Sequence, residues 1–469
     1  MSGLYGTLNL GQQAVQTQRQ GIELTGHNIA NVDNPAFARQ RLDVGTGPAN
    51  GAIGEAPAGG VSAEQVSQIR NQLLDVEIQR ETSVTAFLTT QSETLEGARA
   101  QLGPTFFAAP GSTSDDQISG LAHDLNELFN SFQALANEPG SLQQRTNVLR
   151  QAEGLAHDFN QLDEGLTRAN AQIEAALTKG AENANQLLEA IAHLNDTIQR
   201  SEDRSSLPAH DLRDRRTAKL EELAELTHFT TSESDQGVIS IHLDGITLVN
   251  GSTQTAQIEI VANTDGHPVA MAVSQDERRL VNQGELGAYT TVRDETLRPL
   301  ATRLDTLAAT LVTQVNTIHQ TGFDLEGNTG RAFFTGNDAA SLAVNDTLSE
   351  DPRRLQAAAI PNAAGDNTII RSLSQLSTAA QSSLGNQTLH THLTQSVTSF
   401  NNDLVDARDQ LADQDAIQNL LISQRNAVSG VSLDEEMTNL VKYQNAFQAS
   451  ARLVSVIDEM LETVVNLGR

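Results

Sequence analysis

A seven-residue repeat of apolar side chains near each end of the chain constrains its fold most. At the N-terminal end, Leu4 is followed by a row of positions seven residues apart: Leu8, Val15, Ile22 and Ile29. A repeat of 3.5 residues per turn keeps one narrow apolar seam on the same side of a helix, facing a partner helix. Because an isolated helix of this length is marginally stable in water, we expect this helix to pair.

Residues 429–469 carry the same repeat. Gly430 ends the preceding segment, and Ser432 with Glu435 has the spacing of a capping box, so a helix is predicted to begin here. Its apolar positions are Leu433, Leu440, Phe447, Val454 and Leu461, flanked by Tyr443, Ile457 and Val464. We expect the first and last helices to form an assembly seam, by pairing with each other or with neighbouring molecules. Two ordinary amphipathic core helices are the alternative.

The interior of the chain combines further helical repeats with one stretch that has a different sequence pattern. Apolar positions of helical period run from Leu149 to Ile198, with Gly165 and Gly180 as candidate interruptions. Residues 229–292 instead contain short β-branched runs separated by Asp-Gly and Asn-Gly, which are signals of β-hairpins. The sequence therefore predicts a mainly α protein with an inserted β domain (α+β). Its N- and C-terminal halves are expected to form one elongated, heptad-patterned helical bundle, with the β-rich domain on the outside.

Five segments are expected along the chain. They are an axial coiled-coil helix and turn (1–40), the N-terminal part of a helical rod (41–228), a β-rich insertion (229–292), the C-terminal part of the rod with a small mixed insertion at about 323–372 (293–428), and a second axial coiled-coil helix (429–469).

The segment after the first helix, "NIANVDNPAFARQR" at residues 28–41, predicts an abrupt stop and a turn. Asn and Asp side chains compete for backbone hydrogen bonds, and a proline keeps the residue before it out of the helical region. Arg39 and Arg41 are expected to meet acidic side chains. The predicted turn motif consists of Asn28, Ile29, Ala30, Asn31, Pro35 and Phe37.

Composition excludes several classes of function. A net charge of −29 argues against a nucleic-acid partner, because phosphate contacts need Lys and Arg. The chain has no cysteine, so it has neither disulfides nor thiolate chemistry. The sequence has no run of eighteen apolar residues, so membrane insertion is not predicted. Residues 1–9 do not have the pattern of a signal peptide.

Motifs that carry catalysis or bind metals are missing from the sequence, so we expect no enzyme activity, no cofactor and no metal site. His390 and His392 would suit a metal only if they lay on a strand. The stretch "DLEGNTG" from Asp324 resembles a calcium loop but has Thr329 where the sharp turn needs glycine, so a solvated turn is expected.

The turn motif resembles the signature near the N-terminus of bacterial flagellar axial proteins, the rod, hook and hook-associated components. In these proteins a helix is followed by Asn-Ile-Ala-Asn and a turn with Pro-Gly-Tyr; here Ala36 and Phe37 stand in place of Gly and Tyr. In addition, residues 211–226, 284–334 and 429–461 are similar, in the same order, to the hook-associated members that join hook to filament.

This resemblance implies a structural protein that is secreted by the flagellar type III apparatus and assembles at the hook–filament junction. It implies identical subunits in a ring, with the hook protein and the next hook-associated protein as partners and an export chaperone at the C-terminal helix. Another axial protein, such as the hook or the second junction protein, is the alternative reading. A secreted effector or enzyme on a helical scaffold is a further one.

Overall fold

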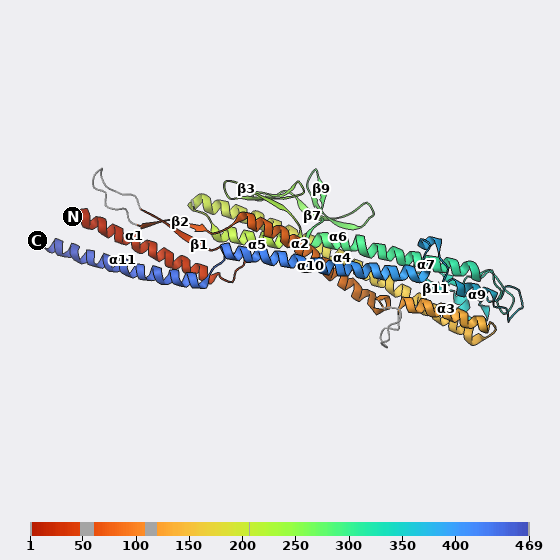
Figure 1. Ribbon diagram of the computed structural model, residues 1–469. Helices are drawn as coiled ribbons and strands as arrows, with labels where there is room; N and C mark the ends of the chain where they lie inside the picture. The colour runs from red at the N-terminus through yellow and green to blue at the C-terminus, as the bar shows by residue number, and fades with distance from the viewer. Residues whose placement is uncertain (1, 47–60, 108–119, 206, 468–469) are drawn as a thin grey trace.

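The computed structural model describes residues 2–46, 61–107, 120–205 and 207–467. The molecule is a long rod of helices with strands projecting from one side, and both termini lie at the same end (Figure 1). The expected fold class, a mainly α bundle with an inserted β domain, is therefore confirmed. Within the described ranges, no helix is both long and apolar enough to cross a membrane.

Helices from both halves of the chain build the rod. The longer ones are α1 (Ser2–Ala30), α2 (Gln72–Phe107), α3 (Leu121–Asn137), α4 (Leu142–Ser205), α5 (His210–Leu226), α7 (Arg298–His319), α10 (Leu389–Ser429) and α11 (Leu433–Leu467). The short helix α6 (Gly284–Thr291) leads through a π-helical turn (Val292–Leu297) into α7. Apolar side chains of α2, α3, α4, α7 and α10 belong to one continuous core.

Helix α4 is the longest of the described helices and runs along the rod (Figure 1). It has 64 residues, which corresponds to a length of about 96 Å at 1.5 Å per residue. Gly165 and Gly180 do not interrupt it, contrary to expectation. A Cβ atom at Gly165 would lie 2.8 Å from the backbone oxygen of Gln101, and one at Gly180 would lie 2.7 Å from a methyl carbon of Leu286. Both glycines therefore allow neighbouring helices to approach α4 closely.

The β insertion consists of two antiparallel sheets between α5 and α6. One sheet has the order β3-β4-β5-β6 and the other β7-β8-β9. The turn between β4 and β5 is Asp244-Gly245, with φ of 44° and 91°, as the Asp-Gly signal predicted. The strands are β3 (Thr230–Glu233), β4 (Ile239–Leu243), β5 (Ile246–Asn250), β6 (Thr253–Gln254), β7 (Gln257–Ala262), β8 (Pro268–Val273) and β9 (Arg278–Leu280).

Two asparagines of α4 fasten these sheets to the rod. The side-chain amide of Asn195 donates to the carbonyl oxygens of Ile239 and Gly251, each at 2.7 Å. Asn185 donates to the carbonyl oxygen of Ile258 and accepts from its N–H, both at 2.8 Å. Each sheet is therefore bound by an α4 side chain that pairs with its backbone.

One element was not anticipated from the sequence. Strands β1 (Gln40–Thr46) and β2 (Val61–Gln68) form an antiparallel ribbon within the range 41–228, which was expected to be helical. Strand β2 reads Val-Ser-Ala-Glu-Gln-Val-Ser-Gln, and its many small and polar residues hide the alternation that marks a half-buried strand.

Short elements close the far end of the rod, around the predicted mixed insertion. They are β10 (Phe334–Thr335), β11 (Ala343–Val344), α8 (Asp346–Glu350), α9 (Thr368–Gln375) and the 3-10 turns Pro352–Arg354 and Ser382–Leu384. The stretch that begins at Asp324 is a turn with Glu326, Asn328 and Thr329 exposed, as expected, but Asp324 itself is buried. Its carboxylate accepts from the N–H groups of Glu326 and Asn328, each at 2.8 Å. Burial raises the pKa of Asp324, but these hydrogen bonds outweigh it and the net direction is down.

A carboxyl pair between α3 and α4 makes stability depend on pH. Burial, a hydrogen bond to Asp124 and the Asp124 charge raise the pKa of Asp158 to about 7. A raised pKa in the folded state contributes stability at low pH, and that stability is lost as the pH rises toward 7. The slope approaches about 1.4 kcal/mol per pH unit for one proton.

We predict that Asp158→Asn is more stable than the unchanged protein at about pH 8 and that it flattens the decline of stability between about pH 4 and pH 7. Urea unfolding across this pH range measures both effects. Asp409→Asn, at an exposed position of α10, is the matched control and should keep the original slope. An unchanged slope in Asp158→Asn would contradict the assignment.

Candidate assembly interface

The two terminal helices lie side by side and antiparallel (Figure 1). The structure places most of the predicted seam residues half-buried: Leu4, Leu8, Val15, Ile22 and Ile29 on α1, and Leu440, Tyr443, Phe447, Val454 and Leu461 on α11. Ile457 is fully buried. Leu433 and Val464 are 49% and 39% exposed, so the pair leaves these two largely open to solvent.

The most buried positions of α1 are small or polar, and the apolar repeat did not reveal them. They are Gly11, Thr17, Gly21, Thr25 and Asn28. A Cβ at Gly21 would lie 2.6 Å from Cδ1 of Tyr443, and one at Gly11 would lie 2.8 Å from Cγ2 of Val454. The large side chains of α11 therefore pack directly on the α1 backbone. The signal in the sequence was the run Gly21, Thr25 and Asn28, whose spacing of four and three residues puts them on one face of the helix.

The predicted turn motif ends α1 through successive tight turns. The N–H groups of Asn31 and Asn34 donate to the carbonyl oxygens three residues earlier, at 3.1 and 3.0 Å. Pro35 is exposed, whereas Phe37 is buried and its ring meets that of His27 edge-on, with 5.4 Å between ring centres. The aromatic residue of the motif thus holds the returning chain against the last turn of α1.

Asn28 joins the first helix, the strand that follows it and the last helix. Its amide nitrogen donates to the carbonyl oxygen of Gln40 at 2.9 Å and to Oε2 of Glu436 at 3.2 Å. Its amide oxygen accepts from the N–H of Gln40 at 3.1 Å. Asn28 and Glu436 are each 2% exposed. The side chain at position 28 must therefore both donate and accept, which an amide does and a carboxylate does not.

Arg39 completes this buried polar cluster, which we define as Asn28, Arg39, Gln40 and Glu436. Its Nε and Nη2 lie 2.8 and 2.7 Å from Oε1 of Glu436, and its Nη1 lies 2.6 Å from Oε2 of Glu435. Its backbone N–H donates to the carbonyl oxygen of Ser429, the last residue of α10, at 2.9 Å. Glu436 and Arg39 thus fix the start of α11. Arg41, as expected, meets an acid, with Nη2 at 2.9 Å from Asp43.

A second set of charges connects the terminal helices and the ribbon to the rod. We call it the joint and define it as Arg70, Asp75, Asp214, Glu221 and Arg425. The guanidinium of Arg70 lies 3.0 Å from Asp75 and 3.3 Å from Asp214, and it donates to the carbonyl oxygen of Ala36 at 3.0 Å. Nη1 of Arg425 lies 2.6 Å from Glu221.

Helix α5 supplies one side of the joint. Besides Asp214 and Glu221, Asp211 accepts from the side chain of Gln40 at 3.3 Å. Asp214 also accepts from the side chain of Gln68 at 3.0 Å. Burial raises the pKa of Asp75, Asp214 and Glu221, and Arg70 and Arg425 offset this only in part. Buried polar groups therefore form part of the contact that the turn motif and the ribbon make with the rod.

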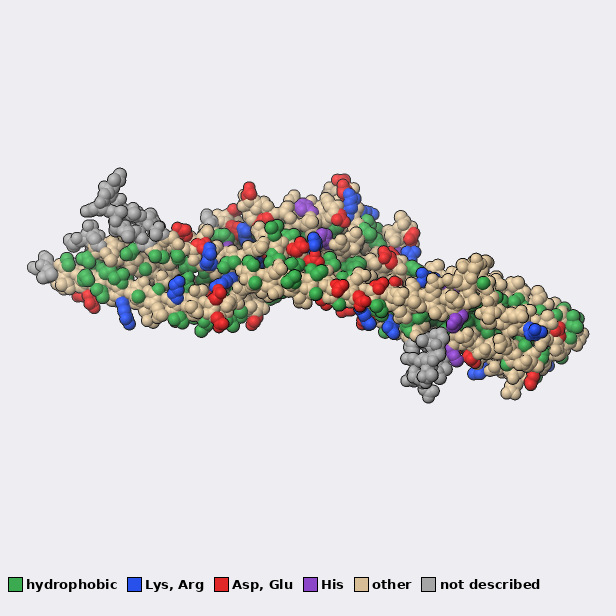
Figure 2. Space-filling view, viewed as in Figure 1, with side chains coloured by type: hydrophobic (Ala, Val, Ile, Leu, Met, Phe, Trp, Pro, Cys, Tyr) green, Lys and Arg blue, Asp and Glu red, His purple; other side chains and the backbone are tan. Residues whose placement is uncertain are grey.

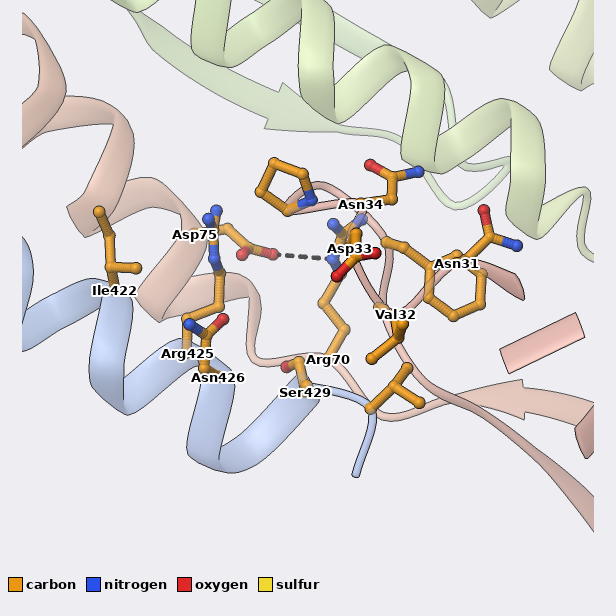
Figure 3. A pocket seen from close by; sticks show the side chains of 15 residues that line it. Asn31, Val32, Asp33, Asn34, Arg70, Asp75, Ile422, Arg425, Asn426 and Ser429 are labelled. Atoms are coloured by element: carbon orange, nitrogen blue, oxygen red, sulfur yellow. Dashed lines mark ion pairs between the residues drawn. The ribbon is translucent and has the colours of Figure 1, made fainter. Parts of the chain in front are cut away.

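A pocket of about 370 Å³ opens beside the joint, between the turn motif and the end of α10 (Figure 3). Arg70 and Asp75 pair across it, and Arg425, Asn426 and Ser429 line its α10 side. Nε of Arg425 is buried without a hydrogen-bond partner among the described residues.

The described residues contain no group of three His, Asp or Glu side chains that could hold a metal ion. His390 and His392 lie in the first turn of α10 and not on a strand, so they point in different directions. The arrangement of the terminal helices and the joint suits mechanical connection: helices held together by packing, with a polar contact at their base.

Neutralising Glu436 tests the buried polar cluster. We predict that Glu436→Gln weakens it by about 3 kcal/mol, because Arg39 and Asn28 lose a buried anionic acceptor. Amide hydrogen exchange at residues 28–40 should then become faster by a factor on the order of 100. Glu435→Gln is the control: its side chain is exposed, and such pairs contribute about 0–1 kcal/mol. Equal exchange in both variants would show that Glu436 does not hold this cluster together.

The close approach of α1 and α11 gives a second prediction. Gly21→Ala should speed hydrogen exchange in both helices, because its methyl group collides with the ring of Tyr443. Gly26→Ala, on the same helix, has open space around the new Cβ and should slow exchange in α1 through a helix propensity gain of up to about 1 kcal/mol. If Gly21→Ala also slowed exchange, the helices would not be packed through this glycine.

Two family models match this chain. Residues 112–334, from the segment before α3 through α7, match the flagellar hook-associated protein FlgK helical domain. Residues 422–467, which include α11, match the C-terminal region of the flagellar basal body rod FlgEFG proteins.

Two proteins that are similar to this chain over its full length have the same name. Flagellar hook-associated protein 1 of Bacillus subtilis is 26% identical, and the alignment covers 99% of each chain. Its Escherichia coli counterpart is 23% identical over 100% of this chain and 98% of the relative. The solved structure of the flagellar hook junction protein FlgK from Burkholderia pseudomallei superposes with a TM-score of 0.63 at 13% identity, covering 76% of this chain and all of that one. Over its whole length, this chain is thus similar to flagellar hook-associated protein 1, and it shares the fold of the hook junction protein FlgK.

Proposed function

We propose that this protein is a structural axial component of the bacterial flagellum that joins hook to filament and assembles through its terminal helices. The match of residues 112–334 to the hook-associated protein helical domain supports the junction role. The match at α11 does not distinguish it, because that match is to a C-terminal region named for basal body rod proteins. We further propose that it works outside the cell after type III export, with its subunits in a ring. The hook protein and the next hook-associated protein are its neighbours, and a chaperone covers α11 before assembly.

The observation that carries this proposal is the surface of α11. While most of its inner side packs on α1, α11 keeps a set of large apolar side chains exposed: Leu433, Met437, Val441, Leu453, Val456, Met460 and Val464. Hydrophobic side chains gather over the end of the molecule that holds both termini (Figure 2). Large apolar side chains that remain exposed in a group on one helix indicate a surface that another molecule covers.

One side of α11 is polar throughout. Thr438, Asn445, Arg452 and Glu459 are seven residues apart and all exposed. This stripe lies opposite the seam in the heptad, so it offers positions for control substitutions that leave the packing on α1 unchanged.

Leu440→Asp tests assembly through the seam. Burial of a leucine contributes about 1.5–3 kcal/mol, and an unpaired carboxylate in its place costs several kcal/mol more. In a strain that lacks the natural protein, the variant should be exported but fail to retain filaments, so that flagellin is shed into the medium. Asn445→Asp adds the same charge on the polar stripe and should support normal filaments. The same amount of shed flagellin from both strains would contradict assembly through this seam.

A further inference from the structure

Two apolar patches lie on the rod beyond the terminal helices. The α2 patch is Leu73 and Val76; Leu73 is 83% exposed, more than any other large apolar side chain among the described residues. The α10 patch is Ile417 and Leu420, which are about half exposed. Single exposed apolar residues are normal on proteins, but these four form two pairs, each one helical turn long.

The two patches lie at nearly the same level along the rod. Helices α2 and α10 pack antiparallel, and the side chain of Gln418 donates to Oγ1 of Thr82 at 3.3 Å. From this contact, Val76 is six residues back along α2 and Leu420 is two residues on along α10. At 1.5 Å per residue, their levels differ by about 6 Å, roughly one helical turn.

They lie on different flanks of the rod. Leu73 and Val76 border a groove of about 810 Å³ that is also lined by residues of α5 and β3, on the side from which the β insertion projects. Helix α10 runs along the opposite edge (Figure 1). On it, Gln414 and Gln418 point toward α2, so Leu420 faces away from that contact and Ile417 lies on its flank.

We propose that the α10 patch of one subunit packs against the α2 patch of the next, in the groove beside Leu73. This inference rests on the proposed function and names the surfaces through which neighbouring copies meet. Two unlike patches at one level on opposite flanks are the geometry of a heterologous contact, which generates a ring or a helical array of identical subunits.

Continuity with α11 identifies a second copy as the occupant. Beyond Ile417 and Leu420, exposed apolar side chains recur at Val428 and then at Leu433, Met437 and Val441 on α11, the helix proposed to be surrounded by other subunits. The contact between copies thus extends from the terminal helices onto the base of the rod. The groove volume of about 810 Å³ is ample for the two α10 side chains.

The natural absence of cysteine allows a direct test. Leu73→Cys and Leu420→Cys are made on separate chains, produced together in a strain lacking the natural protein, and oxidised in isolated flagella. We expect a disulfide-linked dimer only when both variants are present, because each chain then carries one half of the contact. A chain that carries both substitutions should form a ladder of larger products. Leu73→Cys with Thr302→Cys, an exposed position on α7, is the control pair and should give no dimer.

Retention of filaments by the strain with both variants reports on the proposed function, and the disulfide reports on this contact. Filaments retained without a 73–420 dimer would overturn the contact alone, as would a 73–73 dimer, which indicates a two-fold contact. As a second measurement, Leu420→Asp should increase the amount of flagellin shed into the medium. Val405→Asp changes an exposed apolar position nearer the start of α10 and should not increase it. Normal retention with Leu420→Asp would also overturn the contact.

Discussion

The hydrogen bonds of Asn28 are the interaction on which the arrangement of this molecule depends. One amide group binds the backbone of Gln40 in both directions and also reaches Glu436 on the last helix. More than 400 residues separate Asn28 from Glu436 along the chain, yet their contact is buried. Because Glu436 in turn binds Arg39, the direction in which the chain leaves the first helix and the position at which the last helix starts are set together. The seam between α1 and α11 can form in only one register once these groups are paired.

The helices could be predicted from the sequence because each one repeats apolar residues at a local period. The heptads at residues 8–29 and 433–461 and the long repeat from Leu149 to Ile198 all correspond to helices of the structure. The hairpin signals in the β insertion worked for the same reason: Asp244-Gly245 determines its turn from two residues alone. Local rules are sufficient where the information is local.

The features that the sequence did not reveal are relations between distant residues. Gly11 and Gly21 resemble helix-weakening residues until Val454 and Tyr443 are placed against them. In the same way, Asp214 was one acid among many before Gln68 and Arg70 came within reach. Asp324 looked like part of an open turn because nothing local indicates that the surrounding elements bury it. In each case the structural role of a residue depends on a partner tens or hundreds of residues away in the sequence.

The polar character of the joint has a mechanical consequence. Two bodies that meet through apolar surface resist tilting, because any tilt exposes area to water at about 25 cal/mol per Å². Arg70, Asp75 and Asp214 meet instead through ion pairs and hydrogen bonds, and water can replace a typical hydrogen bond at a net cost of about 0.5–1.5 kcal/mol. The 64-residue α4 runs unbroken through the rod, so a tilt of the terminal helices would be taken up at the joint. Such a subunit would combine a stiff rod with a more compliant connection to its terminal helices.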